Sequence, residues 1–358
     1  MTSGEWTVQR LYGVDEEKKW VYFSGFRENN LQAHGYRVAL GGGEPTRLTG
    51  DSGSHSLRFS PDFRYFFDVV SGVHRPMSVT LYETGGPRVR EIMPYLDDRL
   101  KYFALHEPEF LQVPAADGEP LDAMLIRPPD FDPSRKYPVL IHVYSGPQAP
   151  TVRDAWRGTT YLWHQMLAQE GYCIWMCDNR SASMRGAKAA WPIHEDLGKH
   201  ELEDIEAGIA WLKKQAWVDS DRIGIWGWSY GGYMTAYALT HSESFKMGIS
   251  GAPVTDWRNY DAIYTERYMG LPQTNKKGYR DSSVVQAAKN LHGDLLLIHG
   301  TQDDNVHIAN TYQLVLELQK AKKPFWLMVY PKNRHGIRQP AQSRHLRELM
   351  TRFVREKL

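Results

Sequence analysis

Residues 227–233, Gly-Trp-Ser-Tyr-Gly-Gly-Tyr, constrain the fold of this chain more than any other stretch. An apolar run precedes them at residues 222–226, and residues 234–240 have the composition of a helix. A Gly-x-Ser-x-Gly element between a strand and a helix forces its serine onto a sharp, strained turn that exposes the hydroxyl. Its glycines avoid clashes between a β-carbon and the neighbouring strand and helix. The pattern is common by chance, so its meaning depends on the rest of the chain.

The composition is typical of a soluble globular protein of one large or two ordinary domains, with 42% hydrophobic and 24% charged residues among 358. A net charge of +1 argues against a nucleic-acid surface. No stretch approaches the roughly 20 apolar residues of a membrane span, and residues 1–8 do not resemble a signal peptide. We therefore expect no nucleic-acid or membrane partner, and the cytoplasm as the default location.

The cysteines are Cys173 and Cys177. In a strand they lie on the same face but about 13 Å apart, at roughly 3.3 Å per residue. A disulfide needs α-carbons within about 7 Å. We therefore expect two buried free thiols.

Residues 1–105 form a predicted β-rich segment, because short runs of β-branched and aromatic residues alternate with Gly- and Pro-containing turns. The predicted strands cover residues 20–24, 36–40, 56–60, 65–70 and 77–82. Two units share one order of strands and turns, which suits a partial β-propeller, with a small β-sandwich or a sheet extension as alternatives. Two blades cannot close a ring and leave sheet edges exposed. We therefore expect the tail of a longer protein, periplasmic if that protein is exported.

Residues 106–358 form a predicted α/β-hydrolase catalytic domain, built on a doubly wound, mostly parallel sheet. The predicted strands cover residues 121–126, 137–144, 172–177, 222–226, 246–250, 294–299 and 325–330. The predicted helices cover residues 198–214, 232–240, 308–320 and 342–357. In such sheets functional groups gather at the carboxyl ends of the strands.

Three residues of complementary chemistry follow predicted strands in the order Ser229, Asp303, His335. This is the order of the α/β-hydrolase triad. A serine hydroxyl needs a histidine to take its proton, and a carboxylate must hold the histidine in the correct tautomer. The sequence therefore predicts a nucleophile, an acid and a base at one edge of the sheet.

Each triad residue has an alternative reading. Ser229 alone would also fit a structural turn, and Asp304 competes with Asp303, since either aspartate would cap the next helix. His292, His299 and His307 are rivals of His335. We favour His335 because it alone follows the last strand in a short loop, whereas His299 closes a strand and His307 opens a helix.

Acyl transfer also requires an oxyanion hole. The backbone N–H of Tyr230, directly after the nucleophile, is one natural donor. The second donor should come from the loop at residues 143–147, where the hydroxyl of Tyr144 is the candidate. A structural aromatic residue at the sheet edge is the alternative reading of Tyr144.

Several stretches resemble the dipeptidyl peptidase IV branch of the prolyl oligopeptidase family. They are residues 227–233, 251–254 with Trp257, 260–272, 299–307 and 335–337. The similarity covers essentially the whole hydrolase portion, and its longest stretch, YDAIYTERYMGLP at residues 260–272, is hard to obtain by chance.

The resemblance implies that Asp303 is the triad acid and that the Tyr144 hydroxyl is an oxyanion donor. It implies that Asn305 binds a substrate carbonyl. It also implies a pocket for a proline- or alanine-sized side chain, lined by Val254, Trp257, Tyr260, Tyr264 and Val306. An aromatic, shape-limited pocket suits a rigid pyrrolidine ring, although the tyrosines alone would equally fit a protein core.

The chain departs from the family pattern in two places. The family binds the substrate's free amino terminus with a pair of early glutamates and an arginine, which have no evident counterparts here. The pair Glu16 and Glu17 lies in a predicted charged turn instead. Residues 178–186 replace a glycine-rich Asp-x-Arg-Gly-Ser-Gly stretch, so we expect an altered loop there.

The sequence therefore predicts a serine peptidase that cleaves after proline or alanine near the amino terminus of peptides. No metal or organic cofactor is implied. An esterase or broad acyl hydrolase on the same scaffold is the closest alternative, and a catalytically inactive interaction module is another. Because family members often dimerise through this domain, the amphipathic helix at residues 342–357 is a candidate homodimer contact.

Overall fold

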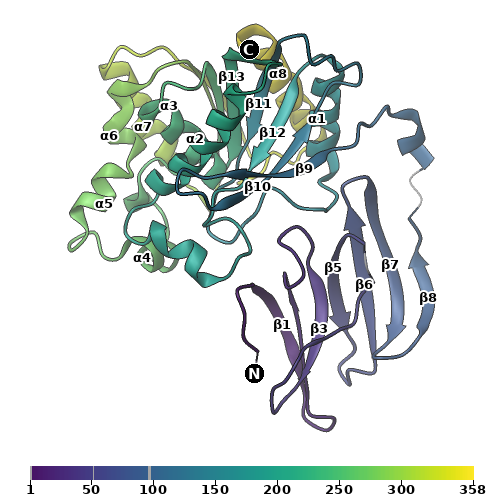
Figure 1. Ribbon diagram of the computed structural model, residues 1–358. Helices are drawn as coiled ribbons and strands as arrows, with labels where there is room; N and C mark the ends of the chain where they lie inside the picture. Colours follow the sequence, from purple (N-terminus) through teal and green to yellow (C-terminus); the bar gives the residue numbers. More distant parts are fainter. Residues whose placement is uncertain (1, 51, 96–97) are drawn as a thin grey trace. The chain divides into compact units, whose positions relative to one another are not determined.

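The computed structural model describes residues 2–50, 52–95 and 98–358. The chain forms two compact units (Figure 1). The first comprises Met1–Pro108, Val152–Gln165 and Ser183–Ala189, and the second comprises Glu109–Thr151, Met166–Ala182 and Ala190–Leu358. A domain boundary after residue 105 remains a prediction from the sequence.

The first unit contains two four-stranded antiparallel sheets, each with its strands in chain order. One sheet consists of β1 (Val8–Asp15), β2 (Trp20–Gly25), β3 (His34–Ala39) and β4 (Thr46–Arg47). The other consists of β5 (Ser54–Phe59), β6 (Tyr65–Gly72), β7 (Arg75–Glu83) and β8 (Arg88–Met93), and a 3₁₀ turn follows at Asp98–Tyr102. The prediction of an all-β segment is therefore confirmed.

The sequence did not reveal β1, β4 and β8. Strand β8 is exposed at all of its residues, so it lacks the apolar alternation that marks a half-buried strand. Strand β1 is mostly exposed as well, and β4 has two residues. Glu16 and Glu17 lie in the exposed turn between β1 and β2, where the charged turn was expected.

The second unit is organised on an eight-stranded sheet with the order β16-β15-β14-β13-β11-β12-β10-β9. Its strands are β9 (Glu109–Pro114), β10 (Pro120–Ile126), β11 (Tyr137–His142), β12 (Cys173–Cys177), β13 (Val218–Trp228), β14 (Met247–Gly251), β15 (Asp294–Gly300) and β16 (Trp326–Tyr330). Six neighbouring strands, β12, β11, β13, β14, β15 and β16, pair in parallel. Strand β10 pairs antiparallel with both β12 and β9. The predicted fold, a mostly parallel hydrolase sheet after an all-β segment, is confirmed.

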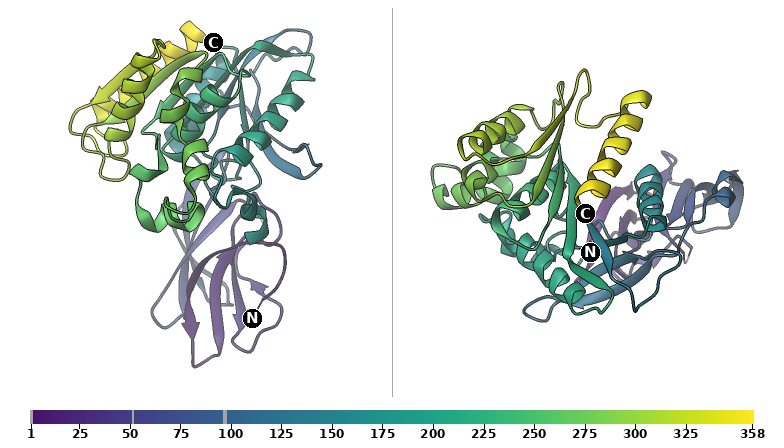
Figure 2. Two further views of the ribbon diagram at one scale, coloured as in Figure 1. Left: turned by 90° about the vertical axis from the view of Figure 1, so that its left-hand side faces the viewer. Right: turned by 90° about the horizontal axis from the view of Figure 1, so that it is seen from above.

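Eight α-helices are described. They are α1 (Gly158–Gln169), α2 (Lys199–Lys213), α3 (Tyr230–His241), α4 (Ala262–Met269), α5 (Lys276–Asp281), α6 (Val284–Ala287), α7 (Ala309–Lys320) and α8 (Pro340–Lys357). The four predicted helices correspond to α2, α3, α7 and α8. Helices α7 and α8 cover opposite faces of the sheet (Figure 2). As its spacing predicts, α8 buries Leu346, Met350, Phe353 and Val354.

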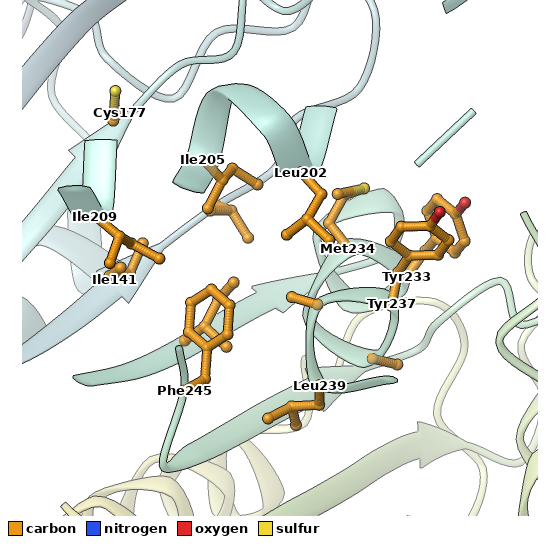
Figure 3. Packing of buried hydrophobic residues seen from close by; sticks show 14 of the residues in the cluster. Ile141, Cys177, Leu202, Ile205, Ile209, Tyr233, Met234, Tyr237, Leu239 and Phe245 are labelled. Carbon is orange, nitrogen blue, oxygen red and sulfur yellow. The ribbon is translucent and has the colours of Figure 1, made fainter. Parts of the chain in front are cut away.

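The core beneath the candidate site lies between the sheet and helices α2 and α3 (Figure 3). Helix α2 contributes Leu202, Ile205 and Ile209, and α3 contributes Met234 and Leu239. Burial of one such side chain stabilises the fold by roughly 1.5–3 kcal/mol. This packing holds the amino-terminal ends of both helices, from which the site is built.

The two cysteines are both buried and free, as predicted. Burial raises the pKa of both thiols, that of Cys173 to about 12, so neither forms a reactive thiolate at neutral pH. Within residues 2–50, 52–95 and 98–358, no helix is long and apolar enough to cross a membrane.

Candidate active site

Backbone strain marks the carboxyl edge of the hydrolase sheet. Four described residues other than glycine have positive φ angles just beyond strand ends: Ser145 after β11 (65°), Ser229 after β13 (62°), Ala252 after β14 (43°) and Lys332 after β16 (60°). Side chains disfavour this region, and such strain concentrates at functional sites. The edge that the sequence selects for chemistry is therefore also the edge at which the backbone is strained.

The turn at Ser229 is tightly enclosed. The Ser229 N–H donates to the Gly251 carbonyl at 2.8 Å, which joins the turn to the end of β14. A β-carbon on Gly231 would lie 2.3 Å from the Val143 carbonyl oxygen. Only glycine lets α3 approach the loop after β11 so closely. The strand-to-helix elbow therefore has the form that the Gly-x-Ser-x-Gly pattern predicts.

Asp303 and His335, from two different loops, are hydrogen-bonded to each other. His335 Nδ1 lies 2.8 Å from Asp303 Oδ2. The Asp303 side chain is fully buried, whereas the His335 side chain is 26% exposed. Because a carboxylate accepts at Nδ1, that nitrogen carries the proton and Nε2 is left to act as a base.

Asp303 is held in its ionised form. Burial alone would raise its pKa, but hydrogen bonds from His299 and His335 outweigh burial and place the pKa well below its usual range. The backbone N–H groups of Asn305 and Val306 each donate to Asp303 Oδ1 at 3.0 Å. A carboxylate with four donors is both fixed in position and kept negative.

His299 is packed at the end of β15, and it also contacts the candidate acid. Its side chain is fully buried, and Nε2 lies 2.8 Å from the Val306 carbonyl and 3.2 Å from Asp303 Oδ2. Its Nδ1 lies 2.7 Å from Thr311 Oγ1. Since a carbonyl accepts only, His299 Nε2 is protonated, and it contacts the same Asp303 oxygen, Oδ2, as His335 does.

The rival residues lie elsewhere. Asp304 is exposed and pairs with Arg334 at 3.1 Å. His307 Nδ1 accepts the Ala309 N–H at the beginning of α7. His292 precedes β15, at the amino end of that strand. Among the residues that the structure describes, no hydrogen bond or ion pair joins any of the three to Asp303 or His335.

Trp228 links the nucleophile turn to the histidine loop. Its indole Nε1–H donates to the His335 backbone carbonyl at 2.7 Å, and Trp228 directly precedes Ser229. The structure therefore brings Ser229 into the neighbourhood of the Asp303–His335 pair. Sequence reasoning missed this role of Trp228, because an indole within an apolar run is usually assigned to the core.

The two candidate oxyanion donors lie beside the serine. Burial raises the pKa of the Tyr144 phenol, and its interaction with the Ser229 side chain opposes that rise only in part, so the phenol keeps its proton at neutral pH. The sequence predicts Tyr144 at the end of a strand. In the structure β11 ends at His142, and Tyr144 lies two residues beyond it. Tyr230 begins α3, where first-turn N–H groups have no partner within the helix.

The loop that departs from the family pattern supports the Tyr144 segment. Asn179 is 1% exposed, and its Nδ2 donates to Ser181 Oγ at 2.7 Å and to the Ser145 carbonyl at 3.4 Å. The Gln148 N–H donates to the Ser181 carbonyl at 2.8 Å. Side-chain hydrogen bonds therefore order this loop in place of glycine turns.

The candidate pocket residues form one aromatic cluster. Trp257 stacks on Tyr264 with ring centroids 6.0 Å apart, and Tyr260 meets Tyr264 edge-on at 5.4 Å. Trp257, Val254 and Val306 are no more than 2% exposed, whereas Tyr260 and Tyr264 are partly exposed. The two tyrosines are therefore the members that a substrate can reach directly.

Asn305 joins this cluster to the turn of the candidate acid. The Tyr260 hydroxyl donates to Asn305 Oδ1 at 2.9 Å, and the Asn305 N–H donates to Asp303. Asn305 is exposed, so its amide N–H₂ group can donate to a bound carbonyl. The roles assigned to these pocket residues remain predictions.

Glu201 is a buried acid that sequence reasoning missed. It lies in the first turn of α2 with 0% exposure, and its Oε1 accepts from the Tyr230 hydroxyl at 2.5 Å. Burial raises its pKa to about 7, although the Tyr230 hydrogen bond opposes that shift. A glutamate three residues after Gly198, before an apolar helical pattern, was the available sequence signal.

Within the described ranges, no group of three or more His, Cys, Asp or Glu side chains could hold a metal ion.

Known proteins resemble this chain along its whole length. Human dipeptidyl peptidase 8 is 37% identical over all of this chain, which covers 42% of that relative. Dipeptidyl peptidase 4 of Trichophyton equinum is 37% identical over 87% of the chain, which covers 41% of that protein. The crystal structure of Porphyromonas gingivalis dipeptidyl peptidase 4 superposes with a TM-score of 0.94 at 35% identity, over 100% of this chain and 51% of that one.

The chain thus spans about two fifths of the length of the curated relatives it matches. Residues 160–358 match the model of the prolyl oligopeptidase family, and residues 1–77 match that of the dipeptidyl peptidase IV N-terminal region. This chain belongs to the prolyl oligopeptidase family, in its dipeptidyl peptidase IV branch.

Proposed function

We propose that this chain carries the catalytic machinery of a serine peptidase that releases dipeptides ending in proline or alanine. The observation that carries the proposal is the 2.8 Å hydrogen bond between His335 Nδ1 and a buried, ionised Asp303, beside the strained turn of Ser229. Peptidase activity is also what the names of the relatives describe.

In the proposed reaction, Ser229 Oγ attacks the scissile carbonyl and His335 Nε2 takes the hydroxyl proton. The imidazolium that forms is stabilised by Asp303, which stays ionised. His335 then gives its proton to the leaving amine, and the acyl group remains on Ser229. Water repeats the sequence, with His335 again as base, and releases the dipeptide and the free serine.

The tetrahedral intermediates carry a negative oxygen, which the Tyr144 hydroxyl and the Tyr230 N–H would stabilise. The electrostatic interaction of the Tyr144 phenol with the Ser229 side chain supports this assignment, because it indicates that the phenol lies near the attacking atom. A preorganised donor of this kind contributes about 10²–10³ in kcat.

Substrate selection rests on the aromatic cluster. Tyr260 and Tyr264 offer two ring surfaces at nearly 90° to each other, which suits a compact, rigid ring better than a long side chain. We assign Asn305 to a substrate carbonyl, with Trp257, Val254 and Val306 packed behind the two tyrosines.

An acyl hydrolase that acts on esters is the competing function, because the same groups suffice for an activated ester. Turnover of a Gly-Pro anilide and of a short p-nitrophenyl ester should be compared, with Ser229→Ala as the control. The proposal predicts serine-dependent cleavage of the anilide. Cleavage of the ester alone would refute peptidase activity, and no cleavage of either would favour an inactive module.

We further propose a homodimer contact on the exposed face of α8, a helix that packs Phe353 against Trp326 of the edge strand β16. Light scattering at micromolar concentration should give the mass of a dimer. A monomer mass would reject this contact without affecting the catalytic assignment.

A further inference from the structure

Glu201 connects the beginnings of two helices below the candidate site. Its Oε2 accepts the Gly198 N–H at 2.9 Å, which caps α2, and its Oε1 accepts from the Tyr230 hydroxyl at 2.5 Å, on α3. The glutamate side chain is completely buried. Each carboxylate oxygen of Glu201 therefore accepts one hydrogen bond, one from the beginning of α2 and one from a side chain of α3.

Capping alone does not require this burial. Helix α4 is capped by Asp261, which is exposed and accepts the Tyr264 N–H at 2.9 Å. Burial of a carboxyl group costs free energy unless partners compensate for lost hydration. The second partner, the Tyr230 hydroxyl, therefore points to a role beyond the helix terminus.

The Tyr230 ring lies between the two halves of the site. Its centroid is 6.2 Å from that of Tyr144 and 5.3 Å from that of Trp257. Tyr230 is 4% exposed, so packing surrounds its ring, and its hydroxyl is fixed at the end farthest from the backbone. A shift of this ring would change the packing of the Tyr144 ring and therefore the position of the Tyr144 hydroxyl.

We infer that Glu201 is a positioning residue, which acts through the Tyr230 hydroxyl to hold the Tyr144 and Trp257 rings in register with Ser229. The inference rests on the proposed function, because it concerns the placement of an oxyanion donor and a pocket wall. Glu201 does not touch the substrate; its effect passes through Tyr230.

The test uses Tyr230→Phe, which keeps the backbone N–H and the ring and leaves the cap of α2 intact. We expect kcat for a Gly-Pro anilide to fall about tenfold with KM within about twofold, since small misplacement of a catalytic group affects the chemical step. The matched control is Tyr279→Phe. Tyr279 is a buried residue on α5, and its hydroxyl donates to the Gly270 carbonyl at 2.8 Å. The control should lose similar thermal stability and keep kcat.

Glu201 is tested by a cycle with Tyr230→Phe. Glu201→Met, which removes both acceptors, should lower kcat as much as Tyr230→Phe, and Glu201→Gln, which keeps one oxygen, should restore part of it. The double variant that combines Glu201→Met with Tyr230→Phe should lose no more kcat than either single variant. Both substitutions remove the same hydrogen bond, that between the Tyr230 hydroxyl and Glu201.

The outcomes are distinct. Wild-type kcat in folded Tyr230→Phe, or additive losses in the double variant, would overturn the positioning role while the proposed function stands. An equal loss of kcat in Tyr279→Phe would also overturn it, by showing a general effect of stability. A wild-type protein without serine-dependent activity refutes the proposed function, and this inference with it.

Discussion

Asp303→Asn is the substitution that most sharply separates the two adjacent aspartates. Asp303 Oδ1 accepts two backbone N–H groups at 3.0 Å, so the single oxygen of an asparagine amide should occupy that position. The amide N–H₂ group would then face His335 Nδ1 and His299 Nε2. The amide therefore offers donors where the histidine needs an acceptor.

The effect on catalysis follows from the tautomer. An N–H₂ group that donates to His335 Nδ1 forces the imidazole proton onto Nε2, so Nε2 can no longer take the serine proton. We expect kcat to fall by about 10³–10⁴, as wrong-tautomer triads do. This corresponds to about 4–5.5 kcal/mol in the activation free energy. The opposed donors at His299 should also lower the unfolding free energy by about 1–3 kcal/mol.

The assay is steady-state hydrolysis of a Gly-Pro anilide, after circular dichroism has shown that each variant is folded. Asp304→Asn is the matched control, because it makes the same chemical change at an exposed ion pair with Arg334. We expect kcat within about twofold of the wild type, since exposed pairs contribute 0–1 kcal/mol. A larger loss in Asp304→Asn than in Asp303→Asn would refute the assignment of the acid.

Three further predictions test other parts of the account. Glu201 has its pKa raised from 4.5 to about 7 in the folded state, so it stabilises the fold below pH 4.5 and loses that contribution as the pH rises through 7. Urea titrations should therefore show wild-type stability falling by on the order of 3 kcal/mol across this window relative to Glu201→Gln; parallel curves would contradict the shift. Gly232→Ala should lower the unfolding free energy by about 3 kcal/mol in the same titrations, because its β-carbon would lie 2.2 Å from the Gly251 carbonyl oxygen; an unchanged midpoint would contradict this packing. Tyr260→Phe should raise KM about fivefold in steady-state assays, since loss of the hydrogen bond to Asn305 costs about 1 kcal/mol. An unchanged KM would contradict the assignment of Asn305 to substrate binding.

The sequence predicts those elements whose apolar pattern is complete. The buried parallel strand β15 is a continuous apolar run, and α8 has a clear apolar face, so both were found close to their observed bounds. For β13 the prediction covered only the apolar stretch at residues 222–226 and missed the polar residues 219–221 at its beginning. The short helices α4, α5 and α6 were missed. Each begins at an Asp, Asn or Ser cap and has at most eight residues, which is too short for a helical period to emerge.

The candidate site divides in the same way. Ser229, Asp303 and His335 were predicted because each follows a strand, and strand ends meet at one edge. The supporting residues were missed, because their roles arise from contacts far apart in the chain. Trp228 contacts the His335 carbonyl across 107 positions, and Glu201 contacts Tyr230 across 29. No local pattern encodes such pairs.

The central claim is that Ser229 is the nucleophile of an intact triad, and covalent labelling tests it most directly. The chain should be treated with a fluorophosphonate, digested and mapped by mass spectrometry, alongside Ser229→Ala and Asp303→Asn. We predict one adduct, on the peptide that contains Ser229, absent from Ser229→Ala and formed far more slowly in Asp303→Asn. An unlabelled wild-type protein, or an adduct on another residue, would contradict the account.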